Sequence, residues 1–414
     1  MCPVFGKSGH LLAWTANRAH HAEIGGITPG SMPANATCLA EEGVVIPPMH
    51  LVRAGMPCEP DIAALLTGGP WPTRALSDNL ADLHAQLAAA RHGARALLAM
   101  SEALGDDEVT GRLSGLSTQA REAFARRLAS AGEFDLFATE YLDDGTPLAV
   151  RLIHKGARLT IDFTGSGPVH PGNRNATAAI VRSAVLYVLR LWTGEPIPLN
   201  EGIFDSVDLI VPEGILRPHF SGDPRQSPAV VGGNVETSQR LVDTMLRALR
   251  LESCSQGTMN NVIFGSDTFG HYETIGGGAG AGPGYAGLSG VHTHMTNTAI
   301  TDPEIIERRY PVRIEEFSLR RGSGGAGKWP GGDGIVRTYR FLAPLTVSLL
   351  TEHRMQPPFG MEGGGDGVPG QQFLIRDGRE QCLPGTAQIS VQAGDVLRME
   401  TPGGGGWGAA TSSE

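Results

Sequence analysis

Ile335-Val336-Arg337-Thr338-Tyr339-Arg340-Phe341 combines β-branched and aromatic residues with two arginines, and this stretch decides the fold of the end of the chain. Such a composition is typical of a β-strand. Residues 346–350 and 396–400 have the same character, and segments rich in Gly and Pro separate the three. We therefore predict a β-rich C-terminal domain over residues 308–414, built as a sandwich or a distorted barrel.

The segments upstream of this region predict both helices and strands. Apolar residues at helical spacing predict a helix that begins near Ser77 or Asp78, and a second helix from about Thr118 to Ala131. Two apolar runs flank Lys155-Gly156-Ala157 and predict a hairpin. Further helices are predicted over 175–193 and 235–251, and short strands over 11–15 and 43–48. The fold class is thus mixed α+β, with regions 1–60, 61–307 and 308–414.

Composition and charge exclude several classes of protein. Hydrophobic residues make up 41% and charged residues 18% of the 414 residues, which argues against a disordered chain. The net charge of -10 would repel phosphate backbones, so we expect no nucleic-acid partner. There is no apolar run of membrane-spanning length and no signal-peptide pattern at the start. We therefore expect no membrane association and a cytoplasmic location.

The cysteines do not predict a disulfide framework or a zinc knuckle. There are 5 of them, at long spacings and without a C-x-x-C motif. Cys38 could be a nucleophile, but nothing near it in the sequence lowers a thiol pKa. A buried, inert thiol is the favoured interpretation.

Glycine is the compositional outlier, with 57 residues gathered in short clusters. The cluster at 322–328 is nearly a P-loop, but Trp329 stands where the motif needs Ser or Thr, so we expect no nucleotide to bind there. The cluster at 276–284 has a formal dinucleotide-type match, which Pro283 opposes because it disfavours a helix start there. We predict instead a loop that lines a substrate pocket, since only glycine allows such close backbone approach. Its pocket residues are Gly276, Gly277, Gly278 and Gly280.

Two histidine pairs are the candidate chemical groups. His292 and His294 are two residues apart, which on a strand would place both rings on one face, although hydrogen-bonded loop histidines are the favoured alternative. His20 and His21 are adjacent. Glu23 is near enough in the sequence to bind the same metal ion, or to hydrogen-bond to a histidine that binds it. A metal site needs three or four ligands, and the sequence offers no cluster that completes one.

Several strings, taken together and in order, resemble the hydantoinase B/oxoprolinase family over essentially the whole chain. The strings are Ala16-Asn17-Arg18-Ala19-His20-His21-Ala22-Glu23-Ile24-Gly25-Gly26, Glu41-Glu42-Gly43-Val44-Val45-Ile46-Pro47-Pro48, Asp162-Phe163-Thr164-Gly165-Ser166, Val231-Gly232-Gly233-Asn234-Val235-Glu236-Thr237-Ser238-Gln239, Ser255-Gln256-Gly257-Thr258-Met259-Asn260-Asn261, Glu273-Thr274-Ile275-Gly276-Gly277-Gly278, Val291-His292-Thr293-His294-Met295-Thr296-Asn297, Gly331-Gly332-Asp333-Gly334 and Thr401-Pro402-Gly403-Gly404-Gly405-Gly406-Trp407-Gly408.

The resemblance implies an ATP-dependent hydrolase of cyclic amides such as 5-oxoproline, hydantoins and lactams. In such systems an A-type ATPase subunit phosphorylates the substrate, and the B-type subunit, which this chain resembles, holds a divalent metal such as Zn or Mn. ATP would therefore be used by the partner in a hetero-oligomer. By its position in the string, His20 is the implied metal ligand, with His21 as the second choice and Glu23 as a supporting residue.

The sequence departs from the family pattern at its beginning. The upstream ligands that the resemblance implies are absent, and Glu23 stands where the family has Asp. Residues 1–60 would then be the remnant of an N-terminal metal-site region. A fragment, a split protein and a degenerate subunit are the competing explanations, and the intact downstream strings favour the first two.

The resemblance also suggests roles for residues of the central region. Asn234, His292 and His294 are candidates for positioning or polarising the substrate, and Glu236 is a candidate general base, although each could instead be a buried hydrogen-bonding residue. Three functions stay open at this point: a cyclic amidohydrolase subunit, a subunit of an acetone- or acetophenone-type carboxylase, and a non-catalytic assembly subunit.

Overall fold

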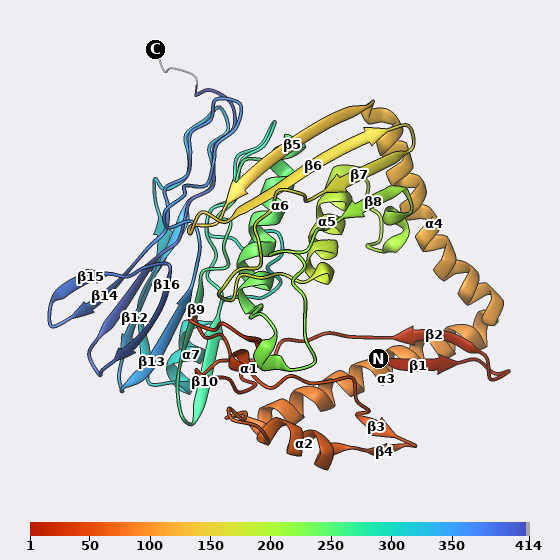
Figure 1. Ribbon diagram of the computed structural model, residues 1–414, viewed down its shortest axis with the longest axis horizontal. Coiled ribbons are helices and arrows are strands. Elements are labelled where there is room, and N and C mark those ends of the chain that lie inside the picture. The colour runs from red at the N-terminus through yellow and green to blue at the C-terminus, as the bar shows by residue number, and fades with distance from the viewer. Residues whose placement is uncertain (411–414) are drawn as a thin grey trace.

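The fold is mixed α+β, as the sequence predicts. A computed structural model describes residues 1–410 (Figure 1), so residues 411–414 of the predicted C-terminal domain lie outside the described residues. Within the described part, none of the helices combines the length and the apolar character needed to cross a bilayer.

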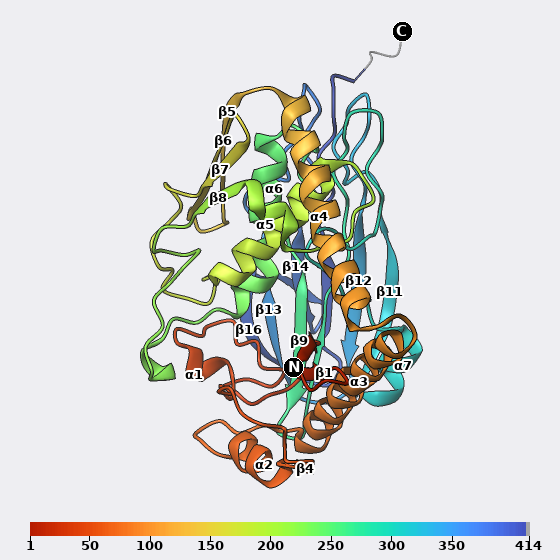
Figure 2. The same ribbon diagram turned by 90° about the vertical axis from the view of Figure 1, so that its right-hand side faces the viewer.

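The N-terminal part is a hairpin that packs on a long, bent helical arm (Figure 1, Figure 2). Val4 and Leu12 of the hairpin are buried against Val109 of the arm. The arm bends at Gly105, whose φ of 89° is a conformation that favours glycine. The elements are β1 (Cys2–Phe5), β2 (Leu11–Thr15), α1 (Leu39–Glu42), β3 (Val52–Arg53), β4 (Met56–Pro57), α2 (Glu59–Thr67), α3 (Leu76–Leu104) and α4 (Asp106–Ala131).

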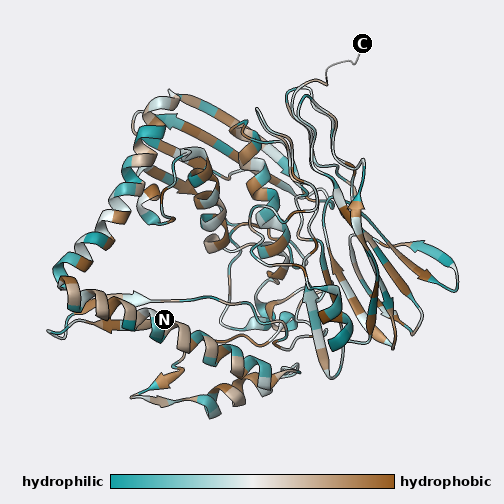
Figure 3. Cartoon of the chain, turned by 180° about the vertical axis from the view of Figure 1, so that it is seen from behind, coloured by the Kyte–Doolittle hydropathy of each residue, from teal (hydrophilic) through white to brown (hydrophobic). Residues whose placement is uncertain are grey.

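The central part is a four-stranded sheet with helices against one face (Figure 1). The strand order is β5-β6-β7-β8. Hydrophobic (brown) and hydrophilic (teal) residues alternate along these strands in Figure 3, because every second side chain faces the helices. The elements are β5 (Phe134–Tyr141), β6 (Pro147–Lys155), β7 (Arg158–Asp162), α5 (Ala178–Thr193), the 3₁₀ turn η1 (Glu201–Ser206), β8 (Val207–Ile210), the 3₁₀ turn η2 (Pro224–Gln226), the π-helical turn η3 (Gly233–Thr237) and α6 (Ser238–Ala248).

The C-terminal part consists of two antiparallel sheets around a second hydrophobic core. One has the order β11-β12-β17-β14-β15 and the other β10-β9-β13-β16, so the second sheet takes two strands from before residue 308. The elements are β9 (Asn261–Ser266), β10 (Phe269–Glu273), α7 (Pro303–Arg309), β11 (Val312–Arg320), β12 (Gly334–Phe341), β13 (Leu345–Leu350), β14 (Gln371–Arg376), β15 (Arg379–Cys382), β16 (Thr386–Val391) and β17 (Val396–Glu400).

Three local predictions differ from the structure. The strand predicted over 43–48 does not form, because Pro47 and Pro48 have no N–H to donate to a neighbouring strand. The second helix begins at Asp106 and not near Thr118, since Gly111 and Gly115 sit within α4 without ending it. The helix predicted from residue 235 is an α-helix only from Ser238, because a π-helical turn precedes it.

Candidate functional site

The largest group of predicted site residues lies around one cavity of about 730 Å³. The N-terminal loop contributes His20 and His21, and the π-helical turn η3 contributes Asn234. Two further polar groups come from Thr274, which directly follows β10, and from Asn297, which lies in the loop before α7. Residues more than 200 positions apart in the sequence therefore share one cavity, whose mostly apolar lining carries a few polar groups, which is the usual form of a small-molecule site.

His20 is an exposed residue on the wall of this cavity. Partial burial of its ring lowers the pKa of His20, and the charges of Arg18 and His21 lower it further. The imidazole is therefore neutral near pH 7, which is the form that can accept a proton or bind a metal.

The other two N-terminal candidates have partners of their own. His21 Nδ1 lies 3.3 Å from an Asp82 carboxylate oxygen on α3. Glu23 is buried, and its two oxygens accept hydrogen bonds from the amides of Gly25 and Gly30 at 2.6 and 2.7 Å. Arg74 pairs with the same carboxylate at 3.2 Å. In this structure Glu23 fixes the loop that follows His20.

Glu42 also lines the cavity, and sequence reasoning did not select it. Its carboxyl oxygens accept hydrogen bonds from the amides of Val230 and Val231, just before η3. Burial raises the pKa of Glu42 to about 7, although these two hydrogen bonds oppose the shift. A carboxyl group that titrates near neutral pH, in the same cavity as a neutral imidazole, is suited to proton transfer.

The π-helical turn η3 places Asn234 and Glu236 differently. Asn234 lines the cavity, whereas Glu236 is fully buried and bonds to Asn261 Nδ2 at 2.6 Å and the Met259 amide at 3.2 Å. Burial raises the pKa of Glu236 to about 8, so this carboxyl is protonated near pH 7. A protonated carboxyl is a proton donor, which makes the predicted role of general base less suited to neutral pH.

Glu236→Gln should make the protein less sensitive to alkaline pH. The folded-state pKa of Glu236 lies above its unfolded value, so its contribution to stability is complete below about pH 4.5 and is lost as the pH rises through about 8. A glutamine copies the protonated acid and cannot ionise. At pH 9 we expect the variant to exceed the native chain in free energy of unfolding by more than about 1 kcal/mol, as measured by urea denaturation. An equal difference at pH 5 and pH 9 would contradict this account.

His292 and His294 do not lie on a strand. The segment is a loop, and His294 has a φ of 53°, so the two rings do not share the face that a strand would give them. His292 is half-buried, and burial lowers its pKa although the charge of Glu273 raises it. Burial also opposes the charged form of His294, but the hydrogen bond from Nε2 to Asp243 (3.2 Å) and the charges of Asp243 and Glu252 raise its pKa.

The glycines predicted to line a pocket pack against other glycine-rich segments. A Cβ on Gly278 would lie 2.0 Å from the Gly332 oxygen, and one on Gly280 would lie 1.9 Å from the Ser253 oxygen. The Gly278 amide bonds to the Pro402 oxygen at 3.0 Å, and the Gly404 amide to the Gly332 oxygen at 2.9 Å. These extended segments form a bundle joined by backbone hydrogen bonds. The pocket role of Gly276 and Gly277, like that of the other two, stays a prediction.

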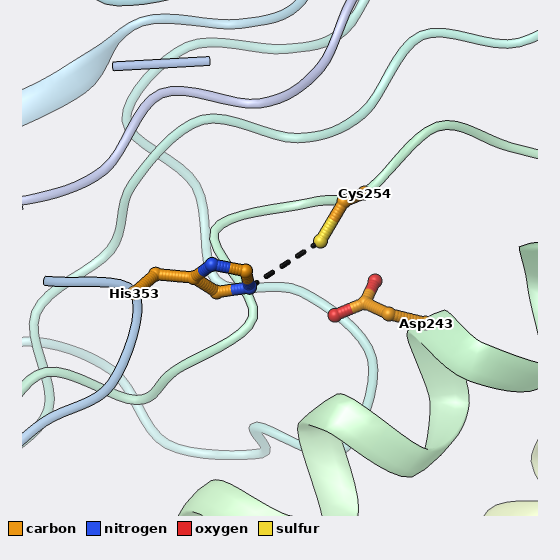
Figure 4. Close-up of side chains that lie close together, drawn as sticks. All are labelled: Asp243, Cys254 and His353. Atoms are coloured by element: carbon orange, nitrogen blue, oxygen red, sulfur yellow. Dashed lines mark hydrogen bonds between the residues drawn. The ribbon is translucent and has the colours of Figure 1, made fainter. Parts of the chain in front are cut away.

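A second polar centre lies inside the protein, where Asp243, Cys254 and His353 come together (Figure 4). Each offers one atom that could hold a metal ion, and these atoms lie within 4.8 Å of one another. All three side chains are buried. Sequence reasoning missed this triad because Cys254 and His353 are 99 positions apart and no motif links them.

The metal site that the family resemblance implies is not complete around His20. In residues 1–410, the triad is the one group of three or more His, Cys, Asp or Glu side chains with metal-binding spacing. His20 has a suitable neutral ring, but the described chain does not supply its co-ligands. We therefore derive no chemical step through a metal at His20.

The fold and these sites define a mixed α+β protein with a cavity lined by residues of several regions and a buried polar centre beside α6. Residues 1–410 match Hydantoinase B/oxoprolinase. The chain belongs to the Hydantoinase B/oxoprolinase family, as its sequence strings predict.

Relatives and solved structures agree with this assignment. The chain is 42% identical over 433 residues to 5-oxoprolinase 1 of Arabidopsis thaliana, a match that covers 98% of this chain and 34% of the relative. The chain therefore spans about a third of the length of that relative. The ATP-dependent caprolactamase from Pseudomonas jessenii has a TM-score of 0.85 at 25% identity, over 98% of this chain and 73% of that chain.

The nucleotide-free structure of an acetone carboxylase shares the fold. Its TM-score is 0.78 over 98% of this chain and 62% of that chain, at 14% identity. At that identity the similarity concerns the fold alone.

Proposed function

We propose that this chain is the B-type part of an ATP-dependent hydrolase of cyclic amides, and that it acts with an A-type ATPase partner. The substrate would be a small ring with an amide bond, such as 5-oxoproline, a hydantoin or a lactam. One support is that relatives of this chain are named 5-oxoprolinase and caprolactamase. Another is that the chain matches only about a third of its plant relative, so other domains or subunits would supply the remaining two thirds.

The cavity around His20 carries this proposal, because it brings together groups suited to handling an activated amide. Asn234 offers an amide that can hydrogen-bond a ring carbonyl or nitrogen, and His20 and Glu42 offer groups that move protons near neutral pH. A volume of about 730 Å³ exceeds the needs of a five- or seven-membered ring, so a phosphorylated intermediate could also be held.

Reconstitution with an A-type partner tests the proposal. The purified chain and the partner are mixed with ATP and 5-oxoproline, and then with hydantoin and caprolactam, while ADP and the ring-opened product are measured together. We expect ring opening that depends on ATP and on both chains. Ring opening by the partner alone, or the absence of product with every ring tested, would contradict the proposal.

Assays of the same reconstituted complex distinguish the hydrolase from the two alternative functions. A ketone carboxylase would consume ATP with acetone or acetophenone and bicarbonate and incorporate labelled carbonate, and it would leave the cyclic amides intact. An assembly subunit would bind the partner and leave the partner's turnover unchanged when His20 is altered. We favour the hydrolase because the carboxylase likeness concerns the fold, whereas the oxoprolinase relative is 42% identical.

A further inference from the structure

The triad of Asp243, Cys254 and His353 joins three separate segments of the chain. Asp243 lies on α6, Cys254 follows that helix, and His353 follows β13. Cys254 Sγ is 3.4 Å from His353 Nε2, and Figure 4 shows the Asp243 carboxylate turned toward the same space. The donor atoms lie within 4.8 Å of one another, a spacing that one ion could bridge after small side-chain movements.

His353 is held in the form that binds metals. Its Nδ1 is 2.6 Å from the Gln356 carbonyl oxygen, which can only accept a hydrogen bond, so Nδ1 carries the proton. The lone pair of Nε2 then faces Cys254. Metal-bound histidines are commonly oriented in this way, by a carbonyl behind the ring.

Asp243 has one carboxylate oxygen without a partner. Oδ1 accepts hydrogen bonds from His294 Nε2 at 3.2 Å and the Ser255 amide at 3.3 Å. Oδ2 has no hydrogen-bond partner within residues 1–410, although the side chain is fully buried. A buried carboxylate oxygen in this state is costly unless a cation or a donor reaches it.

The backbone beside the triad leaves room for nothing larger than glycine. Gly257 has a φ of 59°, and a Cβ there would lie 2.3 Å from His353 Nε2 and 3.1 Å from Asp243 Oδ2. The chain is therefore drawn close around the donor atoms. An organic ligand has no room beside these donor atoms.

We propose that Asp243, Cys254 and His353 bind a thiophilic divalent cation of the Zn²⁺ type, at a site separate from the cavity of His20. One sulfur, one nitrogen and one oxygen donor suit zinc, whereas magnesium and calcium prefer oxygen alone. The bound ion ties the middle of α6 to the segment after β13, and so joins the central helices to the C-terminal sheets. The site is structural, since all three side chains are shut away from solvent.

Groups of both signs surround the triad. A thiolate and a carboxylate would bring two negative charges to a divalent cation, while Asp243 also hydrogen-bonds His294, whose pKa it raises. Arg240 lies nearby, fully buried, and the three nitrogens of its guanidinium have no hydrogen-bond partner within residues 1–410. Glu352 lies 3.9 Å from the Arg240 guanidinium and pairs more closely with Arg174, at 2.9 Å.

Cobalt provides a direct test, because a thiolate ligand gives Co²⁺ a sulfur-to-metal charge-transfer band. The full-length chain is stripped with a chelator and titrated with Co²⁺ alone, while the near-ultraviolet spectrum is recorded. We expect saturation at one ion per triad with this band present. Cys254→Ser should abolish the band and weaken binding about 100-fold or more. Loss of a residue that binds the metal directly should reduce the affinity at least as much as loss of a residue that only hydrogen-bonds to a ligand.

Two control variants keep the test decisive. Cys38→Ser removes another partly buried thiol and should leave the band unchanged, and so should His20→Ala, because His20 is part of the separate cavity. Zn²⁺ should raise the melting temperature of the native chain and of both controls, but not that of Cys254→Ser. A native chain without the band would overturn the proposal and leave a plain S–H···N hydrogen bond. A band that survives Cys254→Ser would overturn it as well.

Discussion

His20→Ala should lower the ATP-dependent ring-opening rate of the reconstituted complex by about 10²- to 10⁴-fold, which is the range for loss of a group that transfers protons in the transition state. His20 lines the same cavity as Asn234 and Glu42, and its lowered pKa keeps the ring neutral and reactive near pH 7. The loss should fall on kcat, with KM changed much less, because an uncharged ring contributes little to ground-state binding.

The matched control for this substitution is His84→Ala. His84 is an exposed histidine of α3, 3.0 Å from Glu59, and it does not belong to the cavity. Both variants should melt within a degree or two of the native chain, since both rings are exposed. Full activity in His20→Ala would remove His20 from the chemistry, and equal losses in both variants would show a general effect on assembly.

Gly278→Ala should lower the free energy of unfolding by about 3 kcal/mol or more, because the added methyl meets rigid backbone on two sides. A Cβ would lie 2.0 Å from the Gly332 oxygen and 2.3 Å from the Gly404 nitrogen. The φ of Gly278 is not in the left-handed region, so the cost comes from packing and not from backbone conformation. Neither neighbour can move without breaking hydrogen bonds of the bundle. Chemical denaturation measures the loss.

Two other glycines are controls for the same substitution. Gly365 lies in the same bundle, but a Cβ there would be 3.4 Å from its nearest neighbour, which is ordinary contact. Gly111 lies within α4 with nothing within 4 Å, so Gly111→Ala should stabilise the chain by about 0.5–1 kcal/mol through helix propensity. If Gly365→Ala were as destabilising as Gly278→Ala, close packing would not explain the bundle's sensitivity.

Local periodicity was sufficient to predict most helices and the central hairpin. The turn at Lys155-Gly156-Ala157 and helix α5 follow from short-range patterns, and both are present. The prediction of a strand over 43–48 was wrong. The segment is apolar, but its two prolines cannot donate hydrogen bonds to a neighbouring strand. Strands β9 and β10 were not predicted, since their partners lie far along the chain and a short apolar run does not reveal such pairing.

The sites show the same limit. The strings around His20 and Asn234 belong to different predicted regions, 1–60 and 61–307, and the structure places both residues on one cavity. Glu42 could have been found, because it stands in a string that carries the family resemblance, but nothing in the sequence shows its burial. Asp243 and His353 had no signal, since their meeting depends on how α6 packs against the segment after β13.

The position of β9 limits how this protein can be divided. β9 lies between β10 and β13, so residues 261–266 supply the hydrogen-bonding partner for one edge of β13. A gene product starting at residue 308 would leave that edge bare, and a bare strand edge is a template for self-association. During synthesis β9 and its neighbour β10 emerge well before β13, so the second edge of β9 stays unpaired until residues 345–350 have been made.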